Sequence, residues 1–164
     1  MSQPLERLER RIIRIPGYRW IDLKAFRWAG QADPEPREVL ASLIAHQAYR
    51  DHYASPESET EAPIHGKYRL EAISVDSFED MSGPEADRIL RMWVEQFGHV
   101  DPGQVEGNLD DAYGQVRDAK TLFHLSDLGK TAEHEWGWVL GRAGFHEFVL
   151  VEPAGLTLLV ASDD

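Results

Sequence analysis

The sequence contains no cysteine, and this absence excludes several kinds of structure and chemistry at once. Without thiols the chain can form neither a disulfide framework nor a thiolate site for zinc or an iron–sulfur cluster, and it has no thiol nucleophile. Long apolar runs are missing too, since no stretch approaches the roughly 20 residues that span a bilayer, and the N-terminus has no signal-peptide core. We therefore expect a cytoplasmic protein without a membrane span, and its 164 residues fit one domain.

Complete catalytic motifs are also absent. Gly129-Lys130-Thr131 matches the end of a phosphate-binding P-loop, but His124 stands where the motif needs its first glycine. The glycines between positions 137 and 144 do not have the spacing of a dinucleotide-binding fingerprint. His134-Glu135 and His146-Glu147 each begin a metalloprotease-like motif whose second histidine is missing. No serine lies in the context of a nucleophile elbow, so none of these reaction classes is supported.

Cationic residues are scarce overall and are concentrated at one end. The chain has 17 lysines and arginines against 29 acidic residues, a net charge of −12. Residues 1–30 hold seven cationic and three acidic side chains, a net charge of +4, so the remainder carries −16. We interpret residues 1–30 as a basic, aromatic-rich N-terminal arm packed on an acidic domain formed by residues 31–164. This charge argues against broad nucleic-acid binding and favours a basic protein partner, although acidic surfaces also serve solubility alone.

The last third of the chain predicts the centre of the fold. Val149–Val151 and Leu158–Ala161 are unbroken apolar runs on either side of a turn that contains Pro153 and Gly155. Strands that are wet on one face alternate polar and apolar residues, so these runs predict a β-hairpin covered on both faces. We expect a single α+β domain with a mixed or mainly antiparallel sheet of four or five strands. The C-terminal hairpin should lie near its centre, with about three packed helices around it.

Other segments have less regular patterns. Leu5 to Ile15 has helical spacing, and Tyr18 to Trp28 allows three interpretations: a strand, an arm that covers the core, or a membrane-surface element. A second helix is predicted from Asp33 to about Ala54, and a strand over Tyr68 to Asp76. The clearest helix covers 83–97 with a cap at Ser82, and its Ile89, Trp93 and Phe97 should pack on the sheet. We predict a further helix over 108–118 and a strand over 121–125, although 121–125 also fits a continuation of that helix.

Two groups of side chains are candidates for a functional site. His134, Glu135 and His146 lie close in sequence and could form a zinc, iron or manganese site, or a general acid–base pair. Neither the presence nor the identity of a metal or other cofactor follows from the sequence. The binding candidates are aromatic or polar side chains that could line a cleft or contact a partner: Trp136, Trp138, His46, Tyr49 and Tyr53. Core packing is the alternative for the two tryptophans, and a half-buried helix flank whose polar ends stay in water is the alternative for the other three.

Three functional hypotheses follow. The first is a binding or accessory protein of the inhibitor or immunity type, which engages a basic protein through its acidic face. The second is a small metal-dependent or acid–base enzyme centred on His134, Glu135 and His146. The third is a membrane- or RNA-contacting arm at residues 5–28, which requires exposed arginines. The first is preferred because the other two lack a complete motif.

Overall fold

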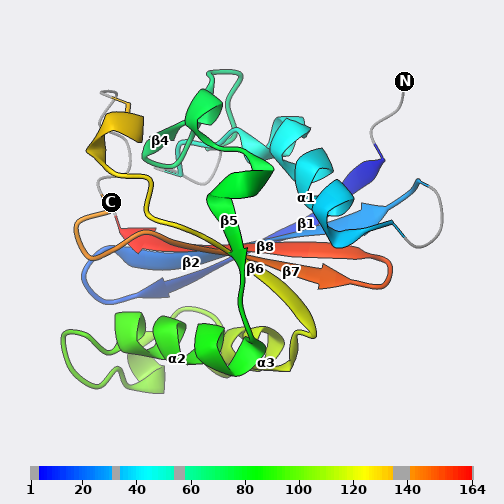
Figure 1. Ribbon diagram of the computed structural model, residues 1–164. Coiled ribbons are helices and arrows are strands. Elements are labelled where there is room, and N and C mark those ends of the chain that lie inside the picture. The colour runs from blue at the N-terminus through cyan, green and yellow to red at the C-terminus, as the bar shows by residue number, and fades with distance from the viewer. Residues whose placement is uncertain (1–3, 31–33, 54–57, 135–140, 164) are drawn as a thin grey trace.

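The computed structural model describes residues 4–30, 34–53, 58–134 and 141–163. Its centre is a six-stranded antiparallel sheet in the order β1-β2-β8-β7-β6-β5 (Figure 1). The strands are β1 (Leu5–Ile15), β2 (Arg19–Trp28), β5 (Phe78–Asp80), β6 (Thr121–Leu125), β7 (His146–Glu152) and β8 (Gly155–Asp163), and a separate pair is formed by β3 (Ile64–His65) and β4 (Tyr68–Arg69). The helices are α1 (Pro36–Ala45), α2 (Gly83–Val94) and α3 (Leu109–Asp118). The predicted α+β class and central C-terminal hairpin are confirmed.

The sheet separates two layers. Helices α2 and α3 cover one face, while α1 and the segment with β3 and β4 cover the other (Figure 1). Every residue of β8 is buried, because its side chains alternate between two cores. Leu158 and Val160 belong to the core on the α1 side, whereas Leu159 and Ala161 belong to the core on the α2–α3 side. This confirms that the apolar runs of the hairpin are covered on both faces.

The helix predicted from Leu5 to Ile15 is wrong, because this segment is β1. It pairs with β2 in a long antiparallel hairpin, whose turn places both Gly17 and Tyr18 at positive φ. A register shift between Arg7 and Arg10 changes the side to which the side chains point. Leu5 therefore packs on the α1 side, whereas Ile13 packs on the α2–α3 side. This bulge removes the strict alternation that would have indicated a strand.

Two further boundaries differ from prediction. Helix α1 ends at Ala45 instead of continuing to about Ala54, because the His46 backbone is extended and its Nδ1 accepts a hydrogen bond from the amide of Ala48 (3.0 Å). That contact begins the 3₁₀ turn Gln47–Tyr49. The strand predicted over 68–76 is also wrong beyond β4, since Leu70–Ala72 and Val75–Ser77 form 3₁₀ turns. The strand that joins the main sheet is β5.

Helices α2 and α3 and strand β6 agree with the prediction more closely than the N-terminal half of the chain does. Ser82 caps α2 by accepting a hydrogen bond from the amide of Glu85 (3.2 Å), and Trp93 is buried on the sheet as predicted. Phe97 was expected to pack on the sheet, but it lies beyond the helix end and is 73% exposed. Helix α3 and strand β6 occupy the predicted positions. In the described part of the chain, no helix is long and apolar enough to cross a membrane.

Candidate functional site

The structure does not bring His134 and His146 into contact. The imidazole of His134 lies 2.6 Å from the carbonyl of Gly66, beside a surface pocket. His146 instead lies against the rings of Trp93 and His124, with centroid separations of 6.5 and 6.3 Å. Burial, with smaller contributions from His124 and Lys67, lowers the pKa of His146 to about 4. Glu135, Trp136 and Trp138 lie outside the described residues.

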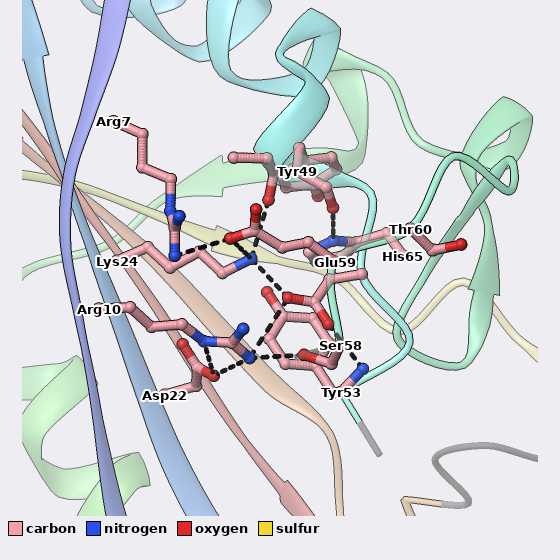
Figure 2. A network of polar contacts seen from close by, with 12 residues as sticks. Arg7, Arg10, Asp22, Lys24, Tyr49, Tyr53, Ser58, Glu59, Thr60 and His65 are labelled. Atoms are coloured by element: carbon pink, nitrogen blue, oxygen red, sulfur yellow. Dashed lines mark hydrogen bonds and ion pairs between the residues drawn. The ribbon is translucent and has the colours of Figure 1, made fainter. Parts of the chain in front are cut away.

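The binding candidates His46, Tyr49 and Tyr53 do not lie on α1, since all three follow its end, and Tyr49 lies in the 3₁₀ turn Gln47–Tyr49. His46 is half-buried and lies against the carbonyl of Leu5 (3.1 Å), and burial lowers its pKa. Tyr49 and Tyr53 are buried on the α1 side of the sheet. Both belong to a polar network that the sequence did not predict (Figure 2).

Oppositely charged groups meet at the centre of this network. Lys24 on β2 is fully buried, and its Nζ donates to Asp51 Oδ2 (2.5 Å) and to the carbonyl of Ala48 (2.8 Å). Arg10 on β1 donates to Asp22 Oδ2 (2.6 Å) and lies 3.4 Å from Asp51 Oδ2. At the rim of the network, Arg7 pairs with Glu59 (2.8 Å; Figure 2). Three cations therefore face three carboxylates, so the network has no net charge.

The two buried aspartates respond differently to this environment. Burial is the largest single influence and would raise the pKa of Asp51, but Lys24, Ser58 and Arg10 together outweigh burial and hold the pKa below its usual value. For Asp22 burial dominates and raises the pKa, against the opposing effect of Arg10. Asp51 is thus the anion that compensates Lys24, and its Oδ1 also accepts from the amide of Tyr53 (2.7 Å). This pairing fastens the segment after α1 to β2.

A second buried group joins Tyr49, His65 and Glu147, none of which is exposed. Glu147 accepts a hydrogen bond from the Tyr49 hydroxyl (2.7 Å) and is paired with His65 Nε2. The Nδ1 of His65 contacts the carbonyl of Tyr49 (2.5 Å), so Nδ1 must carry a proton. One further proton then lies between His65 Nε2 and Glu147, which makes the pair neutral in sum whichever of the two holds it. The group therefore adds no net charge to the core.

These buried groups act as connections within the fold, although Asp22 Oδ1 and the Tyr53 hydroxyl have no hydrogen-bond partner among the described residues. They join strands β1, β2 and β7 to the segment between α1 and β4. The sequence contains one weak signal for this network. Asp22 and Lys24 lie among the apolar and aromatic residues of the segment that forms β2, and charged residues in such a segment are candidates for buried ion pairs. Their partners, Asp51 and His65, are distant in sequence, so no local pattern could identify them.

The other candidate is a surface, which we call the acidic layer: residues 83–118, comprising α2, α3 and their connection (Figure 1). It contains three arginines, no lysine and eight carboxylates, a net charge of −5. Its carboxylates are Glu85, Asp87, Glu95, Asp101, Glu106, Asp110, Asp111 and Asp118. All are exposed except Glu85 and Asp87, which are partly exposed.

Large apolar side chains are exposed in the same layer. Met92 is 61% exposed and Phe97 73% exposed. The buried guanidinium of Arg19, which donates to the carbonyls of Trp93 (2.8 Å) and Val94 (2.9 Å), lies 5.1 Å from the centre of the Phe97 ring. Arg19 thereby caps the C-terminus of α2 and holds this end of the acidic layer against β2.

The described residues contain no group of three or more histidine, aspartate or glutamate side chains arranged to hold a metal ion. Comparison with known proteins found no matching family model, no matching characterised protein and no matching solved structure.

Proposed function

We propose that the protein is a binding protein of the accessory or inhibitor type that engages a basic protein through its acidic layer. One observation carries this proposal: three cations of the N-terminal strands are used within the fold, while the carboxylates of the acidic layer outnumber its arginines. Arg10 and Lys24 pair with buried aspartates, and Arg19 caps α2. The excess negative charge is therefore left on the surface.

The arrangement suits recognition of a positively charged surface. Carboxylates concentrated on one side of a molecule accelerate the encounter with an oppositely charged partner and orient it. Exposed apolar side chains such as Met92 and Phe97 can then exclude water at the contact, which is where most binding energy is usually found. The buried network lies on the α1 side of the sheet, opposite the acidic layer, and takes no part in the proposed contact.

The proposal is tested by capturing partners from cell extract with the tagged chain at about 50 mM salt and washing with about 500 mM salt. A charge-neutralised variant replaces four exposed carboxylates of the acidic layer: Glu95→Gln, Asp101→Asn, Glu106→Gln and Asp110→Asn. Its matched control removes four exposed charges elsewhere: Glu9→Gln, Glu38→Gln, Glu61→Gln and Asp80→Asn.

We expect the wild-type chain and the control to retain the same basic protein at low salt and to release it at high salt. The acidic-layer variant should lose most of that binding. If both variants bind equally well, or if the retained partner is not basic, the acidic layer is not the recognition surface.

A further inference from the structure

A groove of about 460 Å³ lies in the acidic layer, between the C-terminal half of α2 and the start of α3. Its apolar walls come from both helices and their connection: Val94, Val100, Val105 and Leu109. Glu95, directly after α2, and Asp110 on α3 line the same groove, and neither carboxylate forms an ion pair or hydrogen bond with another side chain in the described part of the chain. The groove thus combines an apolar lining with two uncompensated negative charges.

A buried tyrosine also lines the groove. Tyr113 is only 5% exposed, and its hydroxyl has no hydrogen-bond partner among the described residues. Burial raises the pKa of Tyr113 to about 12; Arg91 opposes this shift, and the carboxylates of Glu95, Asp87 and Asp110 add to it, so the hydroxyl keeps its proton at neutral pH. An unpaired hydroxyl beside two carboxylates provides acceptors for a ligand that carries several N–H donors.

A third charged side chain of the groove, Arg91, is already compensated. Arg91 stacks over the Tyr113 ring, with its guanidinium carbon 4.0 Å from the ring centroid, and it pairs with Asp87 (2.9 Å). It therefore neutralises neither Glu95 nor Asp110. It also shows that the chemistry of this groove accommodates a guanidinium against the tyrosine ring.

We infer that the groove between α2 and α3 binds an arginine or lysine side chain of the basic partner. The aliphatic stem would lie along the apolar walls, and the cationic head would reach the carboxylates of Glu95 and Asp110 and the hydroxyl of Tyr113. This inference rests on the proposed function, since it assigns one position of the acidic layer as the anchor for the partner.

The test uses an acetylated and amidated hexa-arginine peptide as probe and follows the amide resonances of the full chain by nuclear magnetic resonance at low salt. The largest shifts should fall on the residues that line the groove. The Glu95→Gln/Asp110→Asn variant should bind the peptide about tenfold more weakly than wild type. Tyr113→Phe, which keeps the ring beneath Arg91, should weaken binding roughly threefold.

The control is Glu61→Gln/Asp80→Asn, which removes the same charge from exposed positions outside the groove and should leave the affinity within about twofold of wild type. Absence of peptide binding, shifts spread over other parts of the acidic layer, or equal losses in the two double variants would each overturn the inference. The two proposals can fail separately. Cellular partner binding that survives Glu95→Gln/Asp110→Asn but is lost in the four-residue variant would reject the groove and retain the acidic layer.

Discussion

Lys24 and Asp51 are fully buried charges, and each depends on the other for compensation. A buried ion pair adds little stability compared with apolar packing, because both ions lose their hydration. Removing one partner, however, strongly lowers stability, since the remaining ion keeps its desolvation penalty without its counter-charge. At the scale of the residue, the segment after α1 therefore keeps its position on β2 only while Lys24 and Asp51 are both present to pair.

Asp51→Asn is expected to destabilise the protein by about 3 kcal/mol or more, because it leaves Lys24 buried without its closest anion. Chemical unfolding in urea measures this change in the free energy of unfolding. The matched control is Asp111→Asn, which breaks an exposed pair with Arg11 (2.8 Å) and should change stability by about 0.5 kcal/mol. Equal effects of the two substitutions would show that Lys24 does not need Asp51.

His146 predicts a pH dependence of stability. Its folded pKa of about 4 lies below the value of about 6.5 expected for an unfolded histidine, so between these pH values only the unfolded state binds the proton. The contribution of His146 to stability is therefore complete above about pH 6.5 and decreases as the pH falls toward 4, by about 2 kcal/mol when its partial exposure is considered.

Urea unfolding at about pH 7 and pH 4.5 should show that His146→Gln loses less stability on acidification than wild type. His99→Gln, at an exposed position, should behave like wild type. The imidazole resonances of His146 give an independent check, and a titration midpoint near 6.5 would contradict the predicted shift.

At the scale of the element, the sequence predicted those helices and strands whose apolar pattern or cap is visible within one continuous stretch of residues. The C-terminal hairpin could be predicted because both of its faces are covered, and α2 because Ser82 caps it at a regular apolar stripe. Strand β1 was mistaken for a helix because the bulge between Arg7 and Arg10 shifts its apolar pattern toward helical spacing. The buried network could not be predicted because its members come from segments that meet only in the folded chain.

The packing of α2 on α3 provides a prediction about an element. A side chain at Gly83, the first residue of α2, would overlap the carbonyl oxygen of Arg117 near the end of α3. Gly83→Ala should therefore destabilise the protein by about 1–3 kcal/mol, although alanine favours helix more than glycine. Gly103→Ala is the control, because a side chain there meets no neighbouring atom and should change stability by less than about 0.5 kcal/mol. A stabilised Gly83→Ala variant would mean that the two helices separate without cost.

At the scale of the whole molecule, the uneven distribution of charge has two consequences of opposite sign. The excess of carboxylates repels itself within the folded protein, and salt screens this repulsion. The same excess attracts a basic partner, and salt screens that attraction as well. Stability of the free chain and affinity for the partner should therefore change in opposite directions with ionic strength.

Raising the salt concentration from about 20 to about 500 mM should increase the free energy of unfolding of the free chain by about 1 kcal/mol, since repulsion among 29 acidic side chains exceeds the attraction offered by 17 cationic ones. Urea unfolding at each salt concentration provides the measurement. The variant that lacks four carboxylates of the acidic layer should gain less from salt than wild type, because it has less repulsion to screen. If salt instead lowered the stability of both proteins, exposed ion pairs such as Arg11–Asp111 would outweigh the repulsion. The acidic layer would then not hold the uncompensated charge on which binding to a basic protein depends.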